Sequence, residues 1–324
     1  MTKRERVIAA IEGREPDGVP SSFSLHFPAD KKTGEAGVKA HLDFFKAADM
    51  DIIKVMNEYR LPIPEIIRTP QDYDRTIPEN YKDQQFLKDQ LAFAKEIVAK
   101  ADPDAFSMGT LHGAAPSSYL PFMNMGKGYT VPEANHLLGT FLRWDEKTML
   151  RAMQRIADGL CELAAGYIKE AKMDAVYYAA PGGSRQWLTD EEHARWIKPF
   201  DLQIMKAVKD AGGYCVLHIC QSDVSMDRYA TGYAEYADVV NWGVYDVPFS
   251  LEDGRELFGK TILGGLANHS GVMVDGTEED VRKEVRNIIG RFGRKNFILG
   301  ADCTLPTTQD MKLLNAAIDE ARHL

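Results

Sequence analysis

The sequence predicts a (β/α)8 TIM barrel, the α/β fold in which eight parallel strands alternate with helices. Short β-branched or aromatic runs are followed by longer stretches with helical spacing, which is typical of parallel strands joined by helices. Eight such units fit within the 324 residues of the chain, as one barrel requires. An open doubly wound sheet is the structural alternative. The missing Gly-rich phosphate fingerprint after the first strand disfavours that alternative.

Eight segments have the composition of short buried strands. They are residues 19–24, 51–56, 105–109, 174–178, 213–217, 238–242, 260–265 and 296–300. The Pro-rich stretch 57–80 and the Gly- and Pro-rich stretch 109–132 are expected as loops over the C-terminal end of the barrel, where active sites of this fold lie. No linker divides the chain, so residues 1–324 are expected to form one barrel domain with an N-terminal helical extension.

Several helix starts are marked by capping residues. Thr2 with Glu5 and Thr189 with Glu192 have the spacing of a capping box, in which each residue satisfies a backbone N–H of the other. Thr277 precedes a run of apolar residues that share one helical face. These signals predict where helices begin, and they carry no information about chemistry.

Charge and composition limit the classes of partner. Asp plus Glu is 48 and Lys plus Arg is 39, which gives a net charge of −9 and argues against nucleic acid as a partner. No apolar run has the length of a membrane helix. Four cysteines do not form a disulfide framework, so a reducing, cytoplasmic location is expected. Barrels of this size often pair, which leaves a homodimer open, although no exposed apolar stripe is readable.

A possible metal site follows the fifth and eighth predicted strands. His218 and Cys220 have the same strand parity and can face one ion, while Cys303 follows the eighth strand at the same end of the barrel. One imidazole and two thiols suit zinc, and three protein ligands leave a position open, as in catalytic sites. The alternative is that these cysteines pack as apolar groups, which we expect of Cys215 and Cys161.

Polar side chains gather at the ends of other predicted strands. His26 follows the first strand, His112 follows the third, Tyr178 ends the fourth and Asn241 lies in the sixth. Each of them alone is compatible with an ordinary turn or cap. Together they form the kind of ring that a substrate pocket needs, so we predict them as catalytic residues. His26 and His112 are expected at the mouth of the pocket.

The chain resembles the uroporphyrinogen decarboxylase superfamily nearly from end to end. Residues 2–13, followed by Pro16-Asp-Gly-Val-Pro20, are similar to the opening helix and first strand of that family. Residues 174–184, Asp-Ala-Val-Tyr-Tyr-Ala-Ala-Pro-Gly-Gly-Ser, are similar to its fourth-strand segment. The resemblance implies a (β/α)8 barrel, in agreement with the strand pattern.

The metal residues point to one branch of this superfamily. Leu217-His-Ile-Cys220 with Cys303 resembles the H-x-C…C zinc motif of corrinoid-dependent methyltransferases, such as methylcobamide:coenzyme M methyltransferase. The resemblance implies that His218, Cys220 and Cys303 bind Zn²⁺. It also implies that a methyl group moves between a corrinoid (cobalamin) carried by a partner protein and a small thiol or methylated substrate. Ala180 departs from the branch, which usually carries an acid there, and the direction of transfer stays open.

Two other functions remain open at this point. A metal-free decarboxylase of the uroporphyrinogen type would share the fold. Its arginine-rich loop after the first strand is replaced here by residues 22–28, Ser-Phe-Ser-Leu-His-Phe-Pro, and a tetrapyrrole with many carboxylates would need those arginines. A non-catalytic, zinc-stabilised binding protein would need a fourth protein ligand that closes the tetrahedron.

Overall fold

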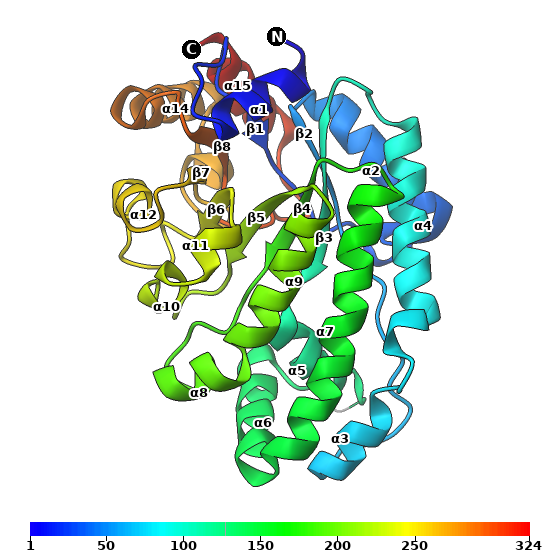
Figure 1. Ribbon diagram of the computed structural model, residues 1–324. Coiled ribbons are helices and arrows are strands. Elements are labelled where there is room, and N and C mark those ends of the chain that lie inside the picture. Colours follow the sequence, from blue (N-terminus) through cyan, green and yellow to red (C-terminus); the bar gives the residue numbers. More distant parts are fainter. Residues whose placement is uncertain (127) are drawn as a thin grey trace.

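Eight parallel strands form a nearly closed barrel in the computed structural model, which describes residues 1–126 and 128–324 (Figure 1). The hydrogen-bonded order runs from β2 in sequence to β8, which pairs with β1. The circle closes where Oδ2 of Asp51, just before β2, accepts the backbone N–H of Ser21 at 3.0 Å. The predicted (β/α)8 fold is confirmed. The strands are β1 (Ser21–Ser22), β2 (Ile52–Val55), β3 (Phe106–His112), β4 (Ala175–Ala179), β5 (Tyr214–Ile219), β6 (Val239–Trp242), β7 (Thr261–Leu266) and β8 (Phe297–Ala301).

Helices surround the barrel and extend beyond one end of it. In Figure 1, α3, α5, α6 and α8 form a lobe at the end opposite the two termini, and α7 runs from this lobe along the barrel wall. The described α-helices are α1 (Lys3–Ile11), α2 (Gly34–Ala48), α3 (Pro70–Thr76), α4 (Gln85–Lys100), α5 (Ala114–Asn124), α6 (Val131–Trp144), α7 (Glu146–Lys169), α8 (Asp190–Trp196), α9 (Lys198–Asp210), α10 (Asp227–Ala230), α11 (Tyr233–Tyr236), α12 (Leu251–Phe258), α13 (Val272–Asp275), α14 (Glu278–Phe292) and α15 (Met311–His323); two 3-10 turns are η1 (Ala29–Lys31) and η2 (Tyr81–Asp83).

Capping residues start the helices where the sequence predicts. Thr2 with Glu5 forms a capping box at α1, and Thr189 with Glu192 forms one at α8. At α14 the side chain of Thr277 accepts the backbone N–H of Asp280, which returns the bond to complete a third box. These boxes satisfy helix N–H groups that have no partner within the helix.

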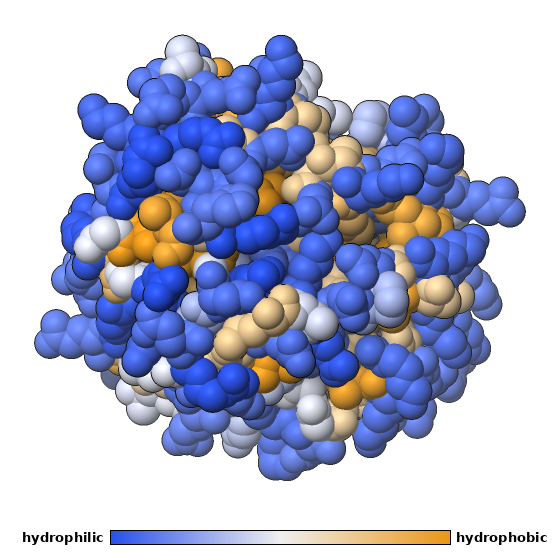
Figure 2. Space-filling view, turned by 90° about the horizontal axis from the view of Figure 1, so that it is seen from above, coloured by the Kyte–Doolittle hydropathy of each residue, from blue (hydrophilic) through white to orange (hydrophobic). Residues whose placement is uncertain are grey.

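Helix α1 closes the N-terminal end of the barrel. Val7 and Ala10 pack against side chains that fill the barrel interior, among them Phe106 and Val239. Nη1 of Arg6 lies 2.5 Å from Oδ1 of Asp51, which ties the helix to the base of β2. Figure 2 views this end from outside, where the surface is mainly hydrophilic. In the described part of the chain, no helix is both long and apolar enough to span a bilayer.

Two strands run at least two residues further than predicted. β3 continues past Gly109 to His112, and β5 continues to Ile219. Gly109 suggested a turn, but a Cβ there would lie 2.7 Å from the ring of Tyr167 on α7. The glycine therefore permits close helix packing and leaves the strand uninterrupted, so that His112 pairs in register with Ala179 of β4.

The two stretches predicted as loops contain helices. Residues 57–80 include α3, which begins at a capping box of Thr69 and Asp72. Residues 109–132 include the end of β3 and all of α5, whose Tyr119 and Phe122 are buried. Pro and Gly misled the prediction: Pro70 stands in the first turn of α3, where proline is tolerated, and α5 accommodates Pro121 within the helix. The segments do stand over the C-terminal end of the barrel, and they build the lobe.

Candidate metal centre

A cavity of about 660 Å³ opens between the C-terminal ends of the strands and the lobe. Its volume is in the range of sites for small ligands. Its lining includes His26, Lys54, Thr110, His112, Tyr177, His218, Cys220 and Cys303. The residues predicted as metal ligands and two of the predicted catalytic residues therefore share one cavity.

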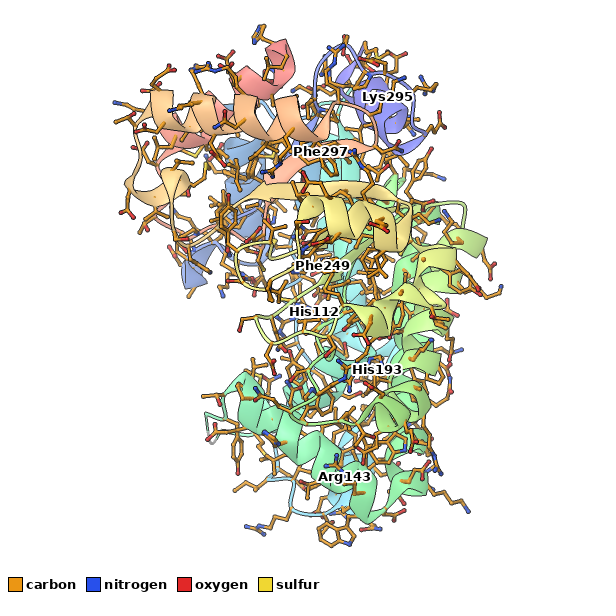
Figure 3. All side chains as sticks on the ribbon, turned by 90° about the vertical axis from the view of Figure 1, so that its left-hand side faces the viewer. His112, Arg143, His193, Phe249, Lys295 and Phe297 are labelled. Atoms are coloured by element: carbon orange, nitrogen blue, oxygen red, sulfur yellow. The ribbon has the colours of Figure 1, made fainter. Side chains whose placement is uncertain are left out.

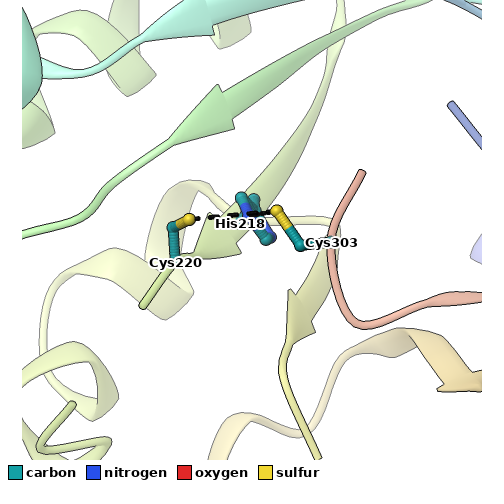
Figure 4. A group of neighbouring side chains, drawn as sticks. All are labelled: His218, Cys220 and Cys303. Carbon is teal, nitrogen blue, oxygen red and sulfur yellow. Dashed lines mark hydrogen bonds between the residues drawn. The ribbon is translucent and has the colours of Figure 1, made fainter. Parts of the chain in front are cut away.

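The three predicted ligands converge at one point of this cavity (Figure 4). Sγ of Cys303 lies 3.5 Å from Nε2 of His218 and 4.0 Å from Sγ of Cys220. All three donor atoms lie within 4.8 Å of one another. A tetrahedral zinc ion with ordinary bond lengths places two ligand sulfurs about 3.8 Å apart, and sulfur and nitrogen about 3.6 Å apart. The donor set fits zinc in type and in spacing.

The barrel brings these ligands together from two strands. His218 points into the barrel near the end of β5, and Cys220 follows that strand directly. Gln221 has a φ of 89°, so the chain leaves the strand direction immediately after Cys220. Cys303 stands just beyond β8. Of the two cysteines predicted to be core, Cys215 is fully buried, while Cys161 is half-buried on α7.

The two ligand thiols lie within hydrogen-bond distance of each other, and either sulfur can be the donor. The contact with Cys220 lowers the pKa of the Cys303 thiol, while the contact with Cys303 and burial raise the pKa of the Cys220 thiol. The nearby His218 imidazole further favours the thiolate of Cys303. Thiolate is the form that binds metal, so these surroundings favour the metal-binding form of Cys303, whereas a cation would have to displace the proton of Cys220.

Tyr178 does not line the cavity, which differs from the prediction. Alternate side chains of a strand point to opposite faces, and Tyr178 points outward, where its hydroxyl donates to the carboxylate of Asp201 and accepts the N–H of Ala114. Burial raises the pKa of Asp201 to about 6. Tyr177 faces inward instead and stacks on His218, with ring centroids 5.1 Å apart.

Asn241 is buried in β6 behind the cavity wall rather than in its lining. Its side-chain N–H groups donate to the carbonyl oxygens of Leu263 and Ala301 at 2.8 and 3.2 Å. These bonds connect β6 to β7 and β8. Asn241 is therefore connected to the cavity only through its neighbours, and a catalytic role for it stays a prediction.

His26 and His112 both line the cavity, and their place at its mouth stays a prediction. The His26 side chain is 60% exposed, and its Nδ1 lies 3.2 Å from Oε1 of Glu58. Nη1 of Arg60 donates to Nδ1 of His112 at 3.2 Å. Because arginine is always a donor, the His112 proton is on Nε2. Figure 3 shows His112 between the barrel and the lobe.

The electrostatic surroundings of His112 fix its role. Burial, with the charge of Arg60, lowers the pKa of His112 to about 3. The imidazole is therefore neutral at physiological pH, with one N–H left for the cavity. The lowered pKa makes His112 a weak base, and the contact with Arg60 leaves its Nε2–H without that partner.

Sequence reasoning missed Lys54, which lies on β2 and is 5% exposed. Its Nζ donates to Oγ of Ser24 at 3.2 Å and stands 3.5 Å from the centroid of the Tyr177 ring. Burial lowers the pKa of Lys54 to about 8. The available signal was a lysine within the apolar run Ile52-Ile53-Lys54-Val55-Met56, because lysine is almost never fully buried without a partner.

Two solved structures with the same fold are similar over nearly their whole length. A methyltransferase from Methanosarcina mazei has a TM-score of 0.75 and 15% identity, over 99% of this chain and 98% of that chain. A B12-independent methionine synthase from Shewanella sp., in complex with selenomethionine, has a TM-score of 0.58 and 15% identity, over 94% of this chain and 97% of that chain. At these identities the similarity shows the fold.

Sequence comparison supplies the family. No curated protein matches the chain. The Uroporphyrinogen decarboxylase (URO-D) family matches residues 45–324, which include every strand from β2 to β8 and all three candidate ligands. The resemblance noted in the sequence is thereby confirmed, and the chain belongs to the uroporphyrinogen decarboxylase (URO-D) family.

Proposed function

We propose that this protein is a zinc-dependent methyltransferase. It would move a methyl group between the corrinoid (cobalamin) of a partner protein and a small thiol or methylated substrate. The observation that carries the proposal is the convergence of His218, Cys220 and Cys303 on one point in the wall of the cavity. The similarity in fold to a methyltransferase, at a TM-score of 0.75, supports it.

The residues of the chain have separable tasks in this proposal. His218, Cys220 and Cys303 would hold Zn²⁺, which when bound lowers the pKa of a coordinated substrate thiol and so supplies a nucleophile at neutral pH. Tyr177 fixes the plane of His218 by stacking. His112 donates an N–H to the ligand, and the lobe excludes bulk water, so that reacting groups are held in line.

The transfer balances without a further reactant. A substrate thiol gives its proton to solvent, and its sulfur forms a bond to the methyl carbon. The bond between that carbon and cobalt breaks, and its electron pair remains on cobalt. The reverse reaction would methylate the corrinoid from a methylated substrate. In either direction the corrinoid protein is a proposed partner. A homodimer is also a proposal.

The structure disfavours the two other functions on specific grounds. A zinc-stabilised binding protein needs a fourth protein ligand, and among residues 1–126 and 128–324 no other His, Cys, Asp or Glu joins the three. A uroporphyrinogen-type decarboxylase would need several cations for its many carboxylates. Lys54 is the only lysine or arginine in the described lining of the cavity.

Zinc content and methyl transfer test the proposal together. Purified wild-type chain, loaded with zinc and passed over a desalting column, should retain about one zinc ion per chain. It should also transfer methyl from methylcobalamin to a small thiol, measured from the loss of cobalt–methyl absorbance. Cys220→Ser and Cys303→Ala should each lower zinc retention and abolish transfer, because a thiolate ligand is lost.

Cys161→Ala is the matched control, since Cys161 lies on α7 and contacts a backbone carbonyl at 3.7 Å. This variant should retain zinc and activity. A wild-type chain that is folded but keeps no zinc contradicts the proposal. If the chain keeps zinc but transfers no methyl group from methylcobalamin to any thiol tested, the metal site is supported and the methyltransferase proposal is contradicted.

A further inference from the structure

Lys54 is a buried cation that lacks a carboxylate partner in the described part of the chain. Its side chain donates to Ser24 and lies over the ring of Tyr177, and both of these partners are neutral. Removing an ammonium group from water is costly unless an opposite charge compensates it. A lysine kept in this position in the wall of a cavity therefore indicates a place for an anion.

The ligand thiolates do not fill that place once a metal is bound. Cys220 and Cys303 would contribute two negative charges, which a divalent cation cancels, and His218 is neutral as a ligand. The charge of Lys54 is then unmatched within the cavity. Asp223 is the one acidic side chain in the described lining, and it already accepts a hydrogen bond from Oγ of Ser184 at 2.6 Å.

Unpartnered polar atoms gather in the same cavity. Oγ1 of Thr110, Oδ1 of Asn135 and Nε1 of Trp187 are buried and have no hydrogen-bond partner among the described residues. Thr110, Asn135 and Trp187 are only 5%, 4% and 3% exposed, and all three line the cavity. Buried polar groups are nearly always paired, so groups left free in a cavity wall indicate hydrogen bonds to a ligand.

Thr110 and His112 lie on β3, the strand next to Lys54, and have the same parity as Met108, which pairs in register with Lys54. Thr110 of β3 pairs in register with Tyr177 of β4, whose ring lies under Nζ of Lys54. His112 follows Thr110 by two residues, so it has the same parity, and its free N–H belongs to Nε2 because Arg60 occupies Nδ1. The ammonium, hydroxyl and imidazole donors thus come from adjacent strands, β2 and β3.

We infer that the cavity contains a second subsite, built for the acid group of a small organic anion, with Lys54 as its counter-ion and Thr110 and His112 as hydrogen-bond donors. The ligand class is a short-chain organic acid whose carboxylate, sulfonate or phosphonate lies against β2 and β3. Its other end reaches the metal centre at β5 and β8. The assignment rests on the proposed function only for the group at the other end of the ligand, which would be the thiol or the methylated group.

Calorimetric titration of the zinc-loaded full chain tests the subsite. The probes are mercaptopropionate, mercaptopropanesulfonate and the neutral mercaptopropanol. Wild type should bind the two acids at least about tenfold more tightly than the alcohol, because a charge-assisted bond to a buried cation is lost with the alcohol. Lys54→Met keeps the length of the side chain and removes its charge, so it should bind all three with similar affinity.

Lys39→Met is the matched control, because Lys39 pairs with Asp43 on the surface of α2. It should keep the preference of wild type. Equal affinity of wild type for acids and alcohol overturns the subsite, and so does an unchanged preference in Lys54→Met. If Lys54→Met does not fold, the wild-type comparison alone remains decisive.

A sulfur-free acid separates this inference from the proposed function. Butyrate should bind Cys220→Ser, which lacks a metal ligand but retains Lys54, and butanol should not. Butyrate binding combined with absent zinc would overturn the methyltransferase and keep the anion subsite. Zinc retention without any preference for acids would keep the proposed metal site and overturn the anion subsite.

Discussion

The hydroxyl of Tyr177 donates to Oδ1 of Asn241 at 2.7 Å. The bond joins β4 to β6 across the barrel interior, and both side chains are buried. Tyr177 stacks on the metal ligand His218 and also lies beneath Lys54. One hydrogen bond therefore holds a ring that contacts both the candidate metal ligand His218 and Lys54.

Substitutions at Tyr177 should separate stability from metal binding. Tyr177→Phe leaves Oδ1 of Asn241 unpaired and should lower the free energy of unfolding by about 1–3 kcal/mol, while the retained ring preserves zinc affinity. Tyr177→Ala also removes the stacking on His218 and should weaken zinc binding by about tenfold or more. Urea unfolding and a competitive zinc titration measure the two effects. An equal loss of zinc affinity in both variants would contradict the role of the ring.

Two helical glycines offer a matched test of packing. A Cβ at Gly254 of α12 would lie 1.9 Å from Cη2 of the buried Trp242, whereas a Cβ at Gly290 of α14 would meet nothing within 4 Å. Gly254→Ala should destabilise the protein by about 1–3 kcal/mol through overpacking. Gly290→Ala should stabilise it by about 0.5–1 kcal/mol through helix propensity. Thermal unfolding of both variants measures the two effects. A lower melting temperature for Gly290→Ala than for wild type would contradict the expectation.

His193 should make stability depend on pH. Burial, with the charges of Arg228 and Lys198, lowers the pKa of His193 to about 4, against about 6.5 in an unfolded chain. Between these values the unfolded chain binds the extra proton. The stabilising contribution is therefore complete above pH about 6.5, and it is lost as the pH falls toward 4, by up to about 1.4 kcal/mol per pH unit.

His193→Phe removes this proton and keeps a ring between Tyr229 and Tyr233, whose centroids lie 6.0 and 6.4 Å from that of His193. The difference in the free energy of unfolding, variant minus wild type, should thus increase as the pH is lowered from about 6.5 to 4. Denaturant titrations at several pH values measure the difference. A difference that stays constant over this range would exclude the linkage.

Removal of metal should leave the barrel folded. The interior residues and α1 form an apolar core cluster that contains none of the three candidate ligands, so we expect this core to persist without metal. Zinc stabilises the native state only through binding, and EDTA should lower the melting temperature without changing the far-ultraviolet circular dichroism. Unfolding on chelation would instead indicate a structural zinc.

Periodicity and local motifs predicted much of the fold because they are short-range properties. The strand–helix rhythm identified the barrel, and the boxes at Thr2 and Thr189 marked helix starts where they occur. The end of β3 was misjudged because Gly109 serves the packing of Tyr167, a contact between residues far apart in the sequence. Proline content likewise concealed α3 and α5.

The candidate site was predictable where residue chemistry is distinctive. Three residues with nitrogen or sulfur donors follow strand ends, and barrel topology brings those ends together, so the sequence predicted one site for all three. Tyr178 was chosen over Tyr177 because the register of a strand decides which of two neighbouring side chains points into the barrel, and the sequence does not specify that register. The apolar run around Lys54 marked it as a buried lysine, but the lack of a carboxylate partner among the described residues became visible only in the three-dimensional arrangement.

Helix α1 packs against the barrel interior at its N-terminal end, so the cavity is approached from the C-terminal end, where the lobe stands. If the proposed transfer is correct, a small substrate and a corrinoid protein would approach the metal centre from the same end of the barrel. We then expect an ordered mechanism, in which the small substrate binds before the protein docks.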